Sequence, residues 1–194
     1  MSGPRVILGS TSYYRAELLR RLLDDFGQRA PGTDEAAIAG EAPADRALRL
    51  AIAKAEAAGD GLDDALVIGS DQVAELDGRL LDKPGSSERA CAQLAASSAR
   101  EVRFHTALCL LDTRNGHRTT HVDLTRVRFR PLRHDEIARY VARERPLDCA
   151  GSFKCEGLGI SLFERIDTDD PSALIGLPLI ALARLLREAG LELP

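Results

Sequence analysis

The sequence predicts a single α/β domain over residues 1–194, with a central mixed β-sheet and flanking helices. Short apolar runs at residues 6–8 and 66–68 have the length of buried strands, and segments with helical spacing of leucine or alanine lie between them. A third observation is the Asn115-Gly116 turn between two strand-like arms, a strong local signal of a β-hairpin. The hairpin adds an antiparallel pair of strands, so we expect a mixed sheet.

The first predicted strand and helix flank a polar turn. A strand over residues 6–9 is followed by Ser10-Thr11-Ser12 and by a helix carrying Leu18, Leu19, Leu22 and Leu23. Ser12 suits the N-cap of that helix, and helix N-termini favour anions. The turn therefore predicts an anion site, although a serine cap on its own needs no ligand.

The remaining elements follow from the same spacing and turn rules. An alanine-rich helix is predicted over residues 44–58, with Lys54 near its C-terminal end, and a second buried strand over 66–69 ends in Ser70-Asp71-Gln72. The other predicted elements are a turn at Asp77-Gly78, a loop at Lys83-Pro84-Gly85, a helix capped by Ser86 or Ser87 and running to about residue 96, hairpin arms at 102–111 and 121–129, a helix over 135–143 ended by Pro146, a glycine-rich stretch at 149–161, and a final helix from Pro178.

Composition limits the class of partner. The chain of 194 residues has 44% hydrophobic and 29% charged residues and a formal net charge of -4. That length buries a sizeable core without disulfides, and the acidic balance argues against a nucleic-acid partner, so we expect a small-molecule partner. Neither an apolar run of about 18 residues nor a signal peptide is visible, which predicts no membrane association and a cytoplasmic location. The cysteines and histidines lack zinc-binding spacing.

Charged residues at strand ends, loops and helix ends are candidates for chemistry on phosphates. Asp71 directly follows the apolar strand, a position from which a carboxylate can project at the end of a sheet and act as a base. An aspartate there can equally cap a turn, so the residue type alone leaves both roles open. Phosphate-loop, dinucleotide-binding, zinc-protease and serine-hydrolase motifs are absent. The basic candidates are Arg15, Lys54, Lys83 and Lys154, and Glu35 with Asp34 could supply a second carboxylate for magnesium or manganese.

Several short motifs occur in a fixed order along the chain. They are Leu8-Gly9-Ser10-Thr11-Ser12 with Arg15, Thr33-Asp34-Glu35, Ala53-Lys54-Ala55, Ile68-Gly69-Ser70-Asp71-Gln72-Val73 and Asp82-Lys83-Pro84. In this combination the chain resembles the Maf family of nucleotide pyrophosphatases, from Leu8 to Leu186.

The resemblance implies an ITPase-like (Maf/Ham1) fold with two lobes and an active-site cleft between them. It also implies hydrolysis of a nucleoside triphosphate, a divalent metal cation (Mg²⁺ or Mn²⁺) and a possible homodimer. Asp71 would be the proton acceptor for the attacking water, and Glu35 and Asp71 would be the metal ligands. The implied phosphate-binding residues are Ser10, Ser12, Arg15, Lys54, Lys83 and Lys154.

Two further stretches, at residues 149–160 and 170–179, look like the branch of the family that hydrolyses 7-methyl-GTP to 7-methyl-GMP and diphosphate. The specificity positions of that branch correspond to Tyr14, Gln72 and Glu156. N7-methylguanine carries a positive charge, so an aromatic face at Tyr14 and a carboxylate at Glu156 suit it, and cation-π stacking contributes about 0.5–2 kcal/mol. Such an enzyme would limit the incorporation of modified nucleotides into nucleic acids.

Two positions depart from the resemblance. Tyr13 stands where the family usually has proline, and Cys155 stands where this branch usually has serine. Because Lys154 adjoins Cys155, we expect a lowered thiol pKa and sensitivity to oxidation at Cys155.

Two other functions stay open at the level of sequence. One is a dTTP or UTP pyrophosphatase of the sister branch, although that branch typically has threonine where this chain has Gln72. The other is a nucleotide-binding regulator of septation that does not turn over its ligand. The retained Asp71, Lys83 and Lys154 favour an enzyme over that regulator.

Overall fold

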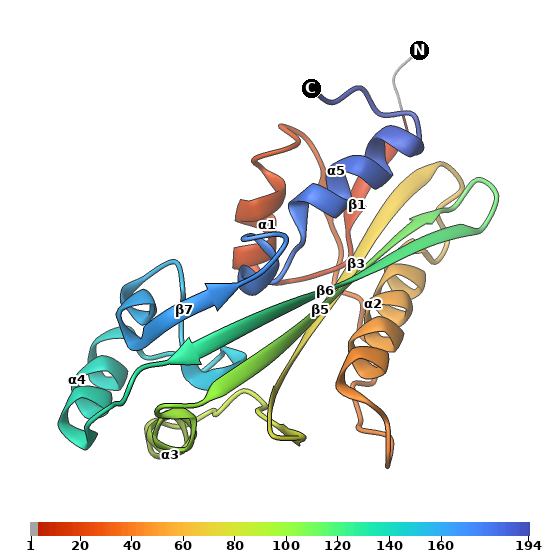
Figure 1. The fold of residues 1–194 in the computed structure, drawn as a ribbon. Helices are drawn as coiled ribbons and strands as arrows, with labels where there is room; N and C mark the ends of the chain where they lie inside the picture. Colours follow the sequence, from red (N-terminus) through yellow and green to blue (C-terminus); the bar gives the residue numbers. More distant parts are fainter. Residues whose placement is uncertain (1–3) are drawn as a thin grey trace. The chain divides into compact units, whose positions relative to one another are not determined.

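The computed structural model describes residues 4–194. Leu8 on the first strand lies opposite Ile68 on the third, in a parallel pair, whereas the fourth and seventh strands pair with their neighbours in antiparallel fashion. The predicted mixed sheet is therefore confirmed. The described residues form a seven-stranded sheet in the order β2 (Gly27–Gln28), β1 (Arg5–Leu8), β3 (Ala65–Leu76), β5 (Glu101–Asp112), β6 (His117–Phe129) and β7 (Phe163–Asp167), with β4 (Arg79–Leu80) paired to β3 (Figure 1).

The chain groups into two compact units. Unit 1 holds residues 4–71, 106–123 and 170–194, and unit 2 holds residues 72–105 and 124–169, so β3, β5 and β6 contribute to both. Unit 1 contains the helices α1 (Tyr13–Leu19), α2 (Pro43–Gly59) and α5 (Leu179–Glu188) and the 3-10 helix η3 (Ala173–Ile175). Unit 2 contains α3 (Ser87–Ser97), α4 (His134–Glu144) and the 3-10 helices η1 (Ala150–Ser152) and η2 (Leu158–Leu162).

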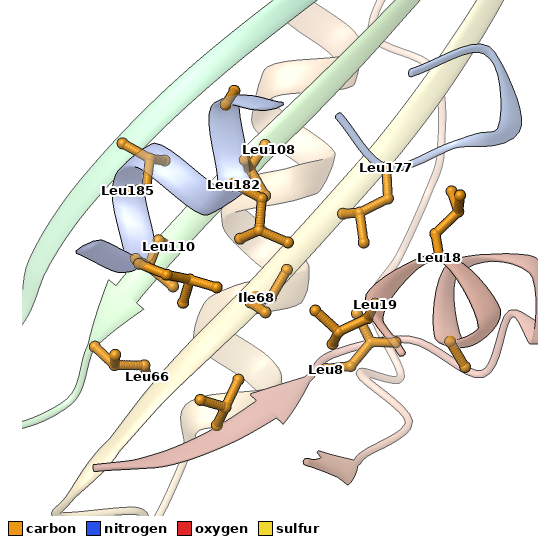
Figure 2. Packing of buried hydrophobic residues seen from close by; sticks show 14 residues of the cluster. Leu8, Leu18, Leu19, Leu66, Ile68, Leu108, Leu110, Leu177, Leu182 and Leu185 are labelled. Carbon is orange, nitrogen blue, oxygen red and sulfur yellow. The ribbon is translucent and has the colours of Figure 1, made fainter. Parts of the chain in front are cut away.

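Leucine side chains from strands and helices form the main core of unit 1 (Figure 2). Leu8, Ile68 and Leu108 of the strands pack with Leu19 of α1 and Leu182 of α5, and all of these side chains are fully buried. Burying such a side chain stabilises the folded state by roughly 1.5–3 kcal/mol. The leucine spacing of residues 179–186 predicts a helix with one apolar side. In the structure this side of α5 packs against the sheet.

α1 is shorter than the leucine spacing predicts. The helix ends at Leu19, and the chain continues in turns in which the N–H of Leu22 bonds to the Leu19 carbonyl. Leu22 and Leu23 still pack on the core, although they lie beyond the helix. The apolar residues at positions 22 and 23 are therefore explained by their contact with the core, and they do not require the helix to continue.

α2 lies against the opposite face of the strands of unit 1. Side chains alternate between the two faces along β1, so Ile7 points toward this face. Two glycines allow this close approach. A Cβ at Gly69 would lie 2.1 Å from the Ala51 carbonyl oxygen, and a Cβ at Gly9 would lie 2.8 Å from the Ala58 Cβ. The backbone of the alanine-rich helix therefore packs very close to the backbone of the strands.

Four phenylalanines form the aromatic core of unit 2. Phe104, Phe129, Phe153 and Phe163 pack edge to face, with ring centroids 4.8–5.7 Å apart. This geometry aligns positive ring edges with negative ring faces. Phe153 comes from the glycine-rich stretch, which is anchored here and contains two short 3-10 helices.

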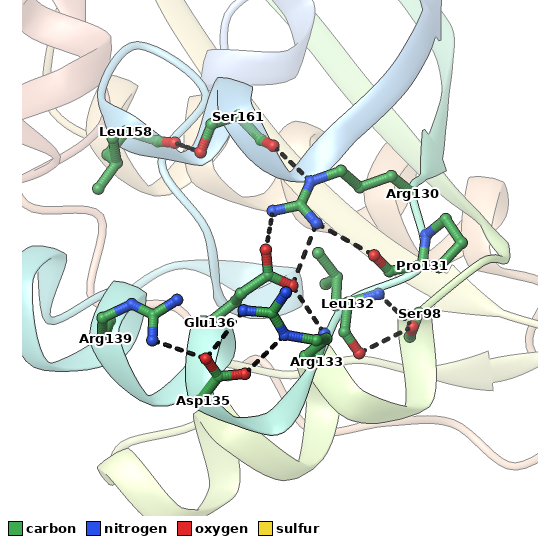
Figure 3. A network of polar contacts seen from close by, with 10 residues as sticks. All are labelled: Ser98, Arg130, Pro131, Leu132, Arg133, Asp135, Glu136, Arg139, Leu158 and Ser161. Carbon is green, nitrogen blue, oxygen red and sulfur yellow. Dashed lines mark hydrogen bonds and ion pairs between the residues drawn. The ribbon is translucent and has the colours of Figure 1, made fainter.

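A polar network holds the start of α4 in unit 2 (Figure 3). Glu136 accepts hydrogen bonds from the Arg133 backbone N–H (2.9 Å) and from the Arg130 guanidinium, and these bonds hold the pKa of Glu136 below its usual value. Arg130 also donates from Nε to the Ser161 carbonyl at 2.9 Å. The network therefore joins the end of β6, the first turn of α4 and η2.

Several local predictions are confirmed. Ser12 and Ser86 are the N-caps of α1 and α3, and each accepts a backbone N–H bond on its hydroxyl. The hairpin of β5 and β6 turns at Asn115-Gly116, and Gly116 has φ of 72°.

Within residues 4–194 we find no helix with the length and apolar character needed to cross a bilayer.

Candidate functional site

The structure corrects the position of Asp71. The sequence predicted that Asp71 follows a strand, but it lies inside β3, because the buried Val73, Ala74 and Leu76 continue that strand. The parallel neighbour β1 nevertheless ends at Leu8, opposite Ile68. Asp71 therefore lies just past the carboxyl end of the parallel pair, and only 7% of its surface is exposed.

Lys54 joins Asp71 to a second carboxylate in unit 1. Its ammonium nitrogen lies 2.6 Å from Asp71 Oδ1 and 2.6 Å from Glu35 Oε1. The side chains of Lys54 and Asp71 are 8% and 10% exposed, whereas that of Glu35 is 54% exposed. The close packing of α2 on β3 explains this contact, since it brings Lys54 over the strand that carries Asp71.

Two arginines of α2 hold the loop that carries Glu35. Arg46 donates to the Glu35 carbonyl and Arg49 to the Ala36 carbonyl, each at 3.2 Å. Arg49 also binds both carboxylate oxygens of Glu41, at 2.6 and 2.7 Å, and this pairing lowers the pKa of Glu41. The loop is thus fastened to α2 at Glu35 and at two residues that follow it, Ala36 and Glu41.

The turn before α1 brings Arg15 into the same unit. Arg15 donates from Nε to the Gly176 carbonyl at 2.8 Å, and its Nη1 lies 3.5 Å from Ser10 Oγ. Burial lowers the pKa of Arg15, while the negative charges of Asp71 and Glu35 oppose this effect. Unit 1 therefore gathers Ser10, Arg15, Lys54, Glu35 and Asp71 into one charged cluster.

Ser12 and Tyr14 flank this cluster along the chain. The Ser12 hydroxyl accepts the Arg15 backbone N–H at 3.4 Å, and the Ser12 N–H bonds to Ser10 Oγ at 3.1 Å. Tyr14 is partly buried, and its ring meets that of the exposed Tyr13 edge to face. The phosphate role of Ser12 and the specificity role of Tyr14 stay predictions.

The other site residues predicted from the sequence lie in unit 2. Gln72 is partly buried next to Asp71 in the chain, and Lys83 is exposed in the loop before Pro84. Lys154 donates from its ammonium group to the Glu144 carbonyl at 3.2 Å, at the end of α4. Glu156 is exposed. The roles proposed for these residues stay predictions.

A sequence profile described as "Maf-like protein" matches residues 5–189. The chain belongs to the Maf family. A Xanthomonas oryzae protein named 7-methyl-GTP pyrophosphatase is 58% identical over 192 residues, which cover 98% of this chain and 100% of that one. Proteins of the same name from Xanthomonas campestris and Burkholderia thailandensis are 56% and 54% identical, over 98% of this chain and 99% and 90% of their own lengths.

The fold of this Maf protein is similar to that of the Ham1 protein of Staphylococcus aureus. The two structures superpose with a TM-score of 0.50 at 16% sequence identity, over 95% of this chain and 98% of Ham1. Together with the mixed sheet, this similarity confirms the predicted ITPase-like fold.

The expectation for the Cys155 thiol is wrong. Burial, together with the negative charge and hydrogen bonding of Glu156, raises the pKa of Cys155 to about 12. The Cys155 sulfur lies 3.5 Å from Glu156 Oε2. Lys154 donates instead to the end of α4, so in this Maf protein its positive charge does not activate the thiol.

Two further residues of the cluster in unit 1, Ser70 and Gly176, have no role predicted from the sequence. Ser70 is fully buried, and its hydroxyl lies 2.8 Å from the Ala107 carbonyl and 2.9 Å from the Gly176 carbonyl. The Gly176 carbonyl thus accepts a hydrogen bond from Arg15 Nε and also lies within hydrogen-bond distance of the Ser70 hydroxyl. A signal for Gly176 was present, since glycine before Leu177-Pro178 marks a turn, but its carbonyl contacts come from residues far away in the chain.

Proposed function

We propose that this Maf protein is a nucleotide pyrophosphatase that hydrolyses 7-methyl-GTP to 7-methyl-GMP and diphosphate. Relatives at 54–58% identity that carry this activity in their names support the substrate. The observation that carries the chemistry is the convergence of Asp71 and Glu35 on Lys54, with Arg15 in the same unit. Catalysis at a polyphosphate needs such fixed charges.

Each group of the cluster suits one part of the reaction. An ionised carboxylate only accepts hydrogen bonds, so Asp71 can orient the attacking water and take its proton. Arg15 and Lys54 supply positive charge where negative charge develops on the phosphates. Arg15 has five N–H donors in a planar fork, and its Nε is held by Gly176, which directs the rest of the guanidinium.

The donor set fits a divalent cation held jointly with the substrate. In the described part of the chain, no group of three or more histidine, cysteine, aspartate or glutamate side chains could hold a metal alone. Mg²⁺ usually takes one or two carboxylates plus phosphate and water oxygens, and Glu35 and Asp71 supply two carboxylates that already converge on one cation. A bound Mg²⁺ or Mn²⁺ would neutralise charge on the phosphates.

The test is diphosphate release from 7-methyl-GTP, GTP, dTTP, UTP, CTP and ITP with Mg²⁺ or Mn²⁺. Wild type is compared with Asp71→Asn and with Asp112→Asn, a control at the β5–β6 turn whose carboxylate pairs with Arg114. We expect preference for 7-methyl-GTP in wild type and the control, and loss of turnover in Asp71→Asn. Preference for dTTP or UTP would place the chain in the sister branch, and absence of turnover would favour the septation regulator.

A further inference from the structure

A buried carboxylate in unit 1 caps the start of α5. Asp170 is 4% exposed and uses both of its oxygens. Oδ2 accepts the Ile180 backbone N–H at 2.7 Å, and Oδ1 accepts the Ser172 N–H at 2.9 Å together with the Ser172 hydroxyl. Ser172 Oγ in turn accepts the Leu179 N–H at 2.8 Å. The first two N–H groups of α5 are therefore bound to side chains that precede the helix.

These bonds close residues 170–180 into a loop, and two of its carbonyls accept hydrogen bonds from residues outside it. The Ala173 carbonyl accepts the Thr106 hydroxyl at 2.9 Å, which fixes the loop to β5. The Gly176 carbonyl accepts Arg15 Nε at 2.8 Å, and the Ser70 hydroxyl lies 2.9 Å from it. The loop thus supplies the acceptor that orients the Arg15 guanidinium.

Gly176 itself suits this position because of its backbone. Its φ is 124°, a region that other residues rarely adopt, and a Cβ there would lie 3.4 Å from Arg15 Nε. Because glycine has no side chain to hold its backbone, the hydrogen bonds that close the loop determine where the Gly176 carbonyl points.

We propose that Asp170 is a positioning residue for the pyrophosphatase reaction, acting through the loop and the Gly176 carbonyl to set the direction of the Arg15 guanidinium. This role rests on the proposed function, in which Arg15 meets the phosphates. A charge-assisted bond to a fixed acceptor restricts a flexible arginine to one direction, and a small displacement of a substrate-positioning group lowers the rate strongly.

The substitution Asp170→Asn tests this role with little change of volume. Asparagine has one acceptor oxygen, so it cannot accept at both positions as Asp170 does, and at least one bond of the closure is lost. We expect kcat/KM for 7-methyl-GTP to fall by about tenfold. Thr113→Val is the matched control, because it removes hydrogen bonds to Ala65 in the same unit, at 2.9 and 3.2 Å, away from the cluster.

A double-mutant cycle separates positioning from general stability. Arg15→Lys removes the Nε donor, so Asp170→Asn should cause no further loss of kcat/KM in the Arg15→Lys background. An equal loss in both backgrounds would overturn the proposal, because it would indicate a purely structural cap. Thr113→Val should lower the melting temperature while leaving kcat/KM of the folded enzyme unchanged.

A second measurement does not depend on turnover. The Nε–Hε NMR signal of Arg15, assigned by its absence in Arg15→Lys, should shift and exchange faster with solvent in Asp170→Asn but not in Thr113→Val. An unchanged signal would overturn the proposal even if Arg15→Lys is too slow to assay. If wild type does not hydrolyse 7-methyl-GTP, the proposed function fails by itself, whereas the NMR result still decides whether Asp170 positions Arg15.

Discussion

Lys54 is a charged residue in a place where charge is costly. Its side chain is 8% exposed, and burying an unpaired ammonium group would cost several kcal/mol. Asp71 and Glu35 offset this cost, but buried ion pairs seldom stabilise a fold more than apolar residues of the same size do. The arrangement is therefore better explained by chemistry than by stability.

Glu156 is the residue at which base preference can be tested most directly. If its carboxylate accepts the N1 and N2 donors of N7-methylguanine, Glu156→Gln should reduce the ratio of kcat/KM for 7-methyl-GTP over GTP by about tenfold, because the carboxylate also attracts the positive charge that only the methylated base carries. Glu164→Gln is the control, since Glu164 is an exposed carboxylate of β7 in the same unit. The two ratios are measured by diphosphate release, and an unchanged ratio in Glu156→Gln removes the assignment.

The Cys155 thiol should be unreactive at neutral pH. Its pKa is raised to about 12, so its thiolate fraction at pH 8 is on the order of 1,000-fold below that of a free cysteine. Because the pH stays below this pKa, alkylation by iodoacetamide should keep rising with pH between about 7 and 10. Mass spectrometry of the labelled peptide, with Cys155→Ser as the blank, gives the rate. A plateau near pH 8 would mean that the thiol is activated after all.

At the scale of elements, signals that lie within a few residues predict structure well. The serine caps at Ser12 and Ser86 and the Asn115-Gly116 hairpin all depend on near neighbours, and the structure confirms them. β2 and β4 are two residues long and have no pattern of their own. β7 reads Phe-Glu-Arg-Ile-Asp without strict alternation, and only pairing with β6 makes it a strand.

A side chain at Gly69 should disrupt the packing of α2 on β3. A Cβ there would lie 2.1 Å from the Ala51 carbonyl and 2.6 Å from the Ala55 nitrogen, so the helix backbone must move. We expect Gly69→Ala to lower the free energy of unfolding by about 3 kcal/mol or more, and to lower turnover because Lys54 moves with α2.

Gly61→Ala is the control for this substitution. Gly61 has φ of 70° with open space around its Cβ direction, so only backbone strain of about 1 kcal/mol is expected. Urea unfolding followed by circular dichroism gives both values. If Gly69→Ala costs no more than Gly61→Ala, α2 does not pack on β3 as closely as described.

At the scale of the whole molecule, the sequence does not predict where the residues of the cluster meet. The cluster of unit 1 is formed by residues 10, 15, 35, 54, 70, 71 and 176, and nothing in their spacing predicts that Lys54 bridges two carboxylates. The functional roles of five of these residues, 10, 15, 35, 54 and 71, were implied by resemblance to a family. Their contacts follow from the parallel pairing of β1 with β3 and from the approach of α2, which are long-range features.

Binding of substrate and metal together should stabilise the folded protein as a whole. A non-hydrolysable analogue of 7-methyl-GTP with a methylene bridge between the α and β phosphates, at about 100 times its Kd with Mg²⁺, should add about 2.7 kcal/mol. For a chain of this size that corresponds to a rise of roughly 5–10 °C in Tm. Mg²⁺ alone should raise Tm little, because Glu35 and Asp71 already share Lys54 and the described residues place no third histidine, cysteine, aspartate or glutamate ligand with them. Differential scanning fluorimetry with the analogue, with Mg²⁺, with both and with EDTA measures these shifts. An analogue shift that is the same in EDTA as in Mg²⁺ would show that the polyphosphate is held by Arg15, Lys54 and their neighbours without a metal ion.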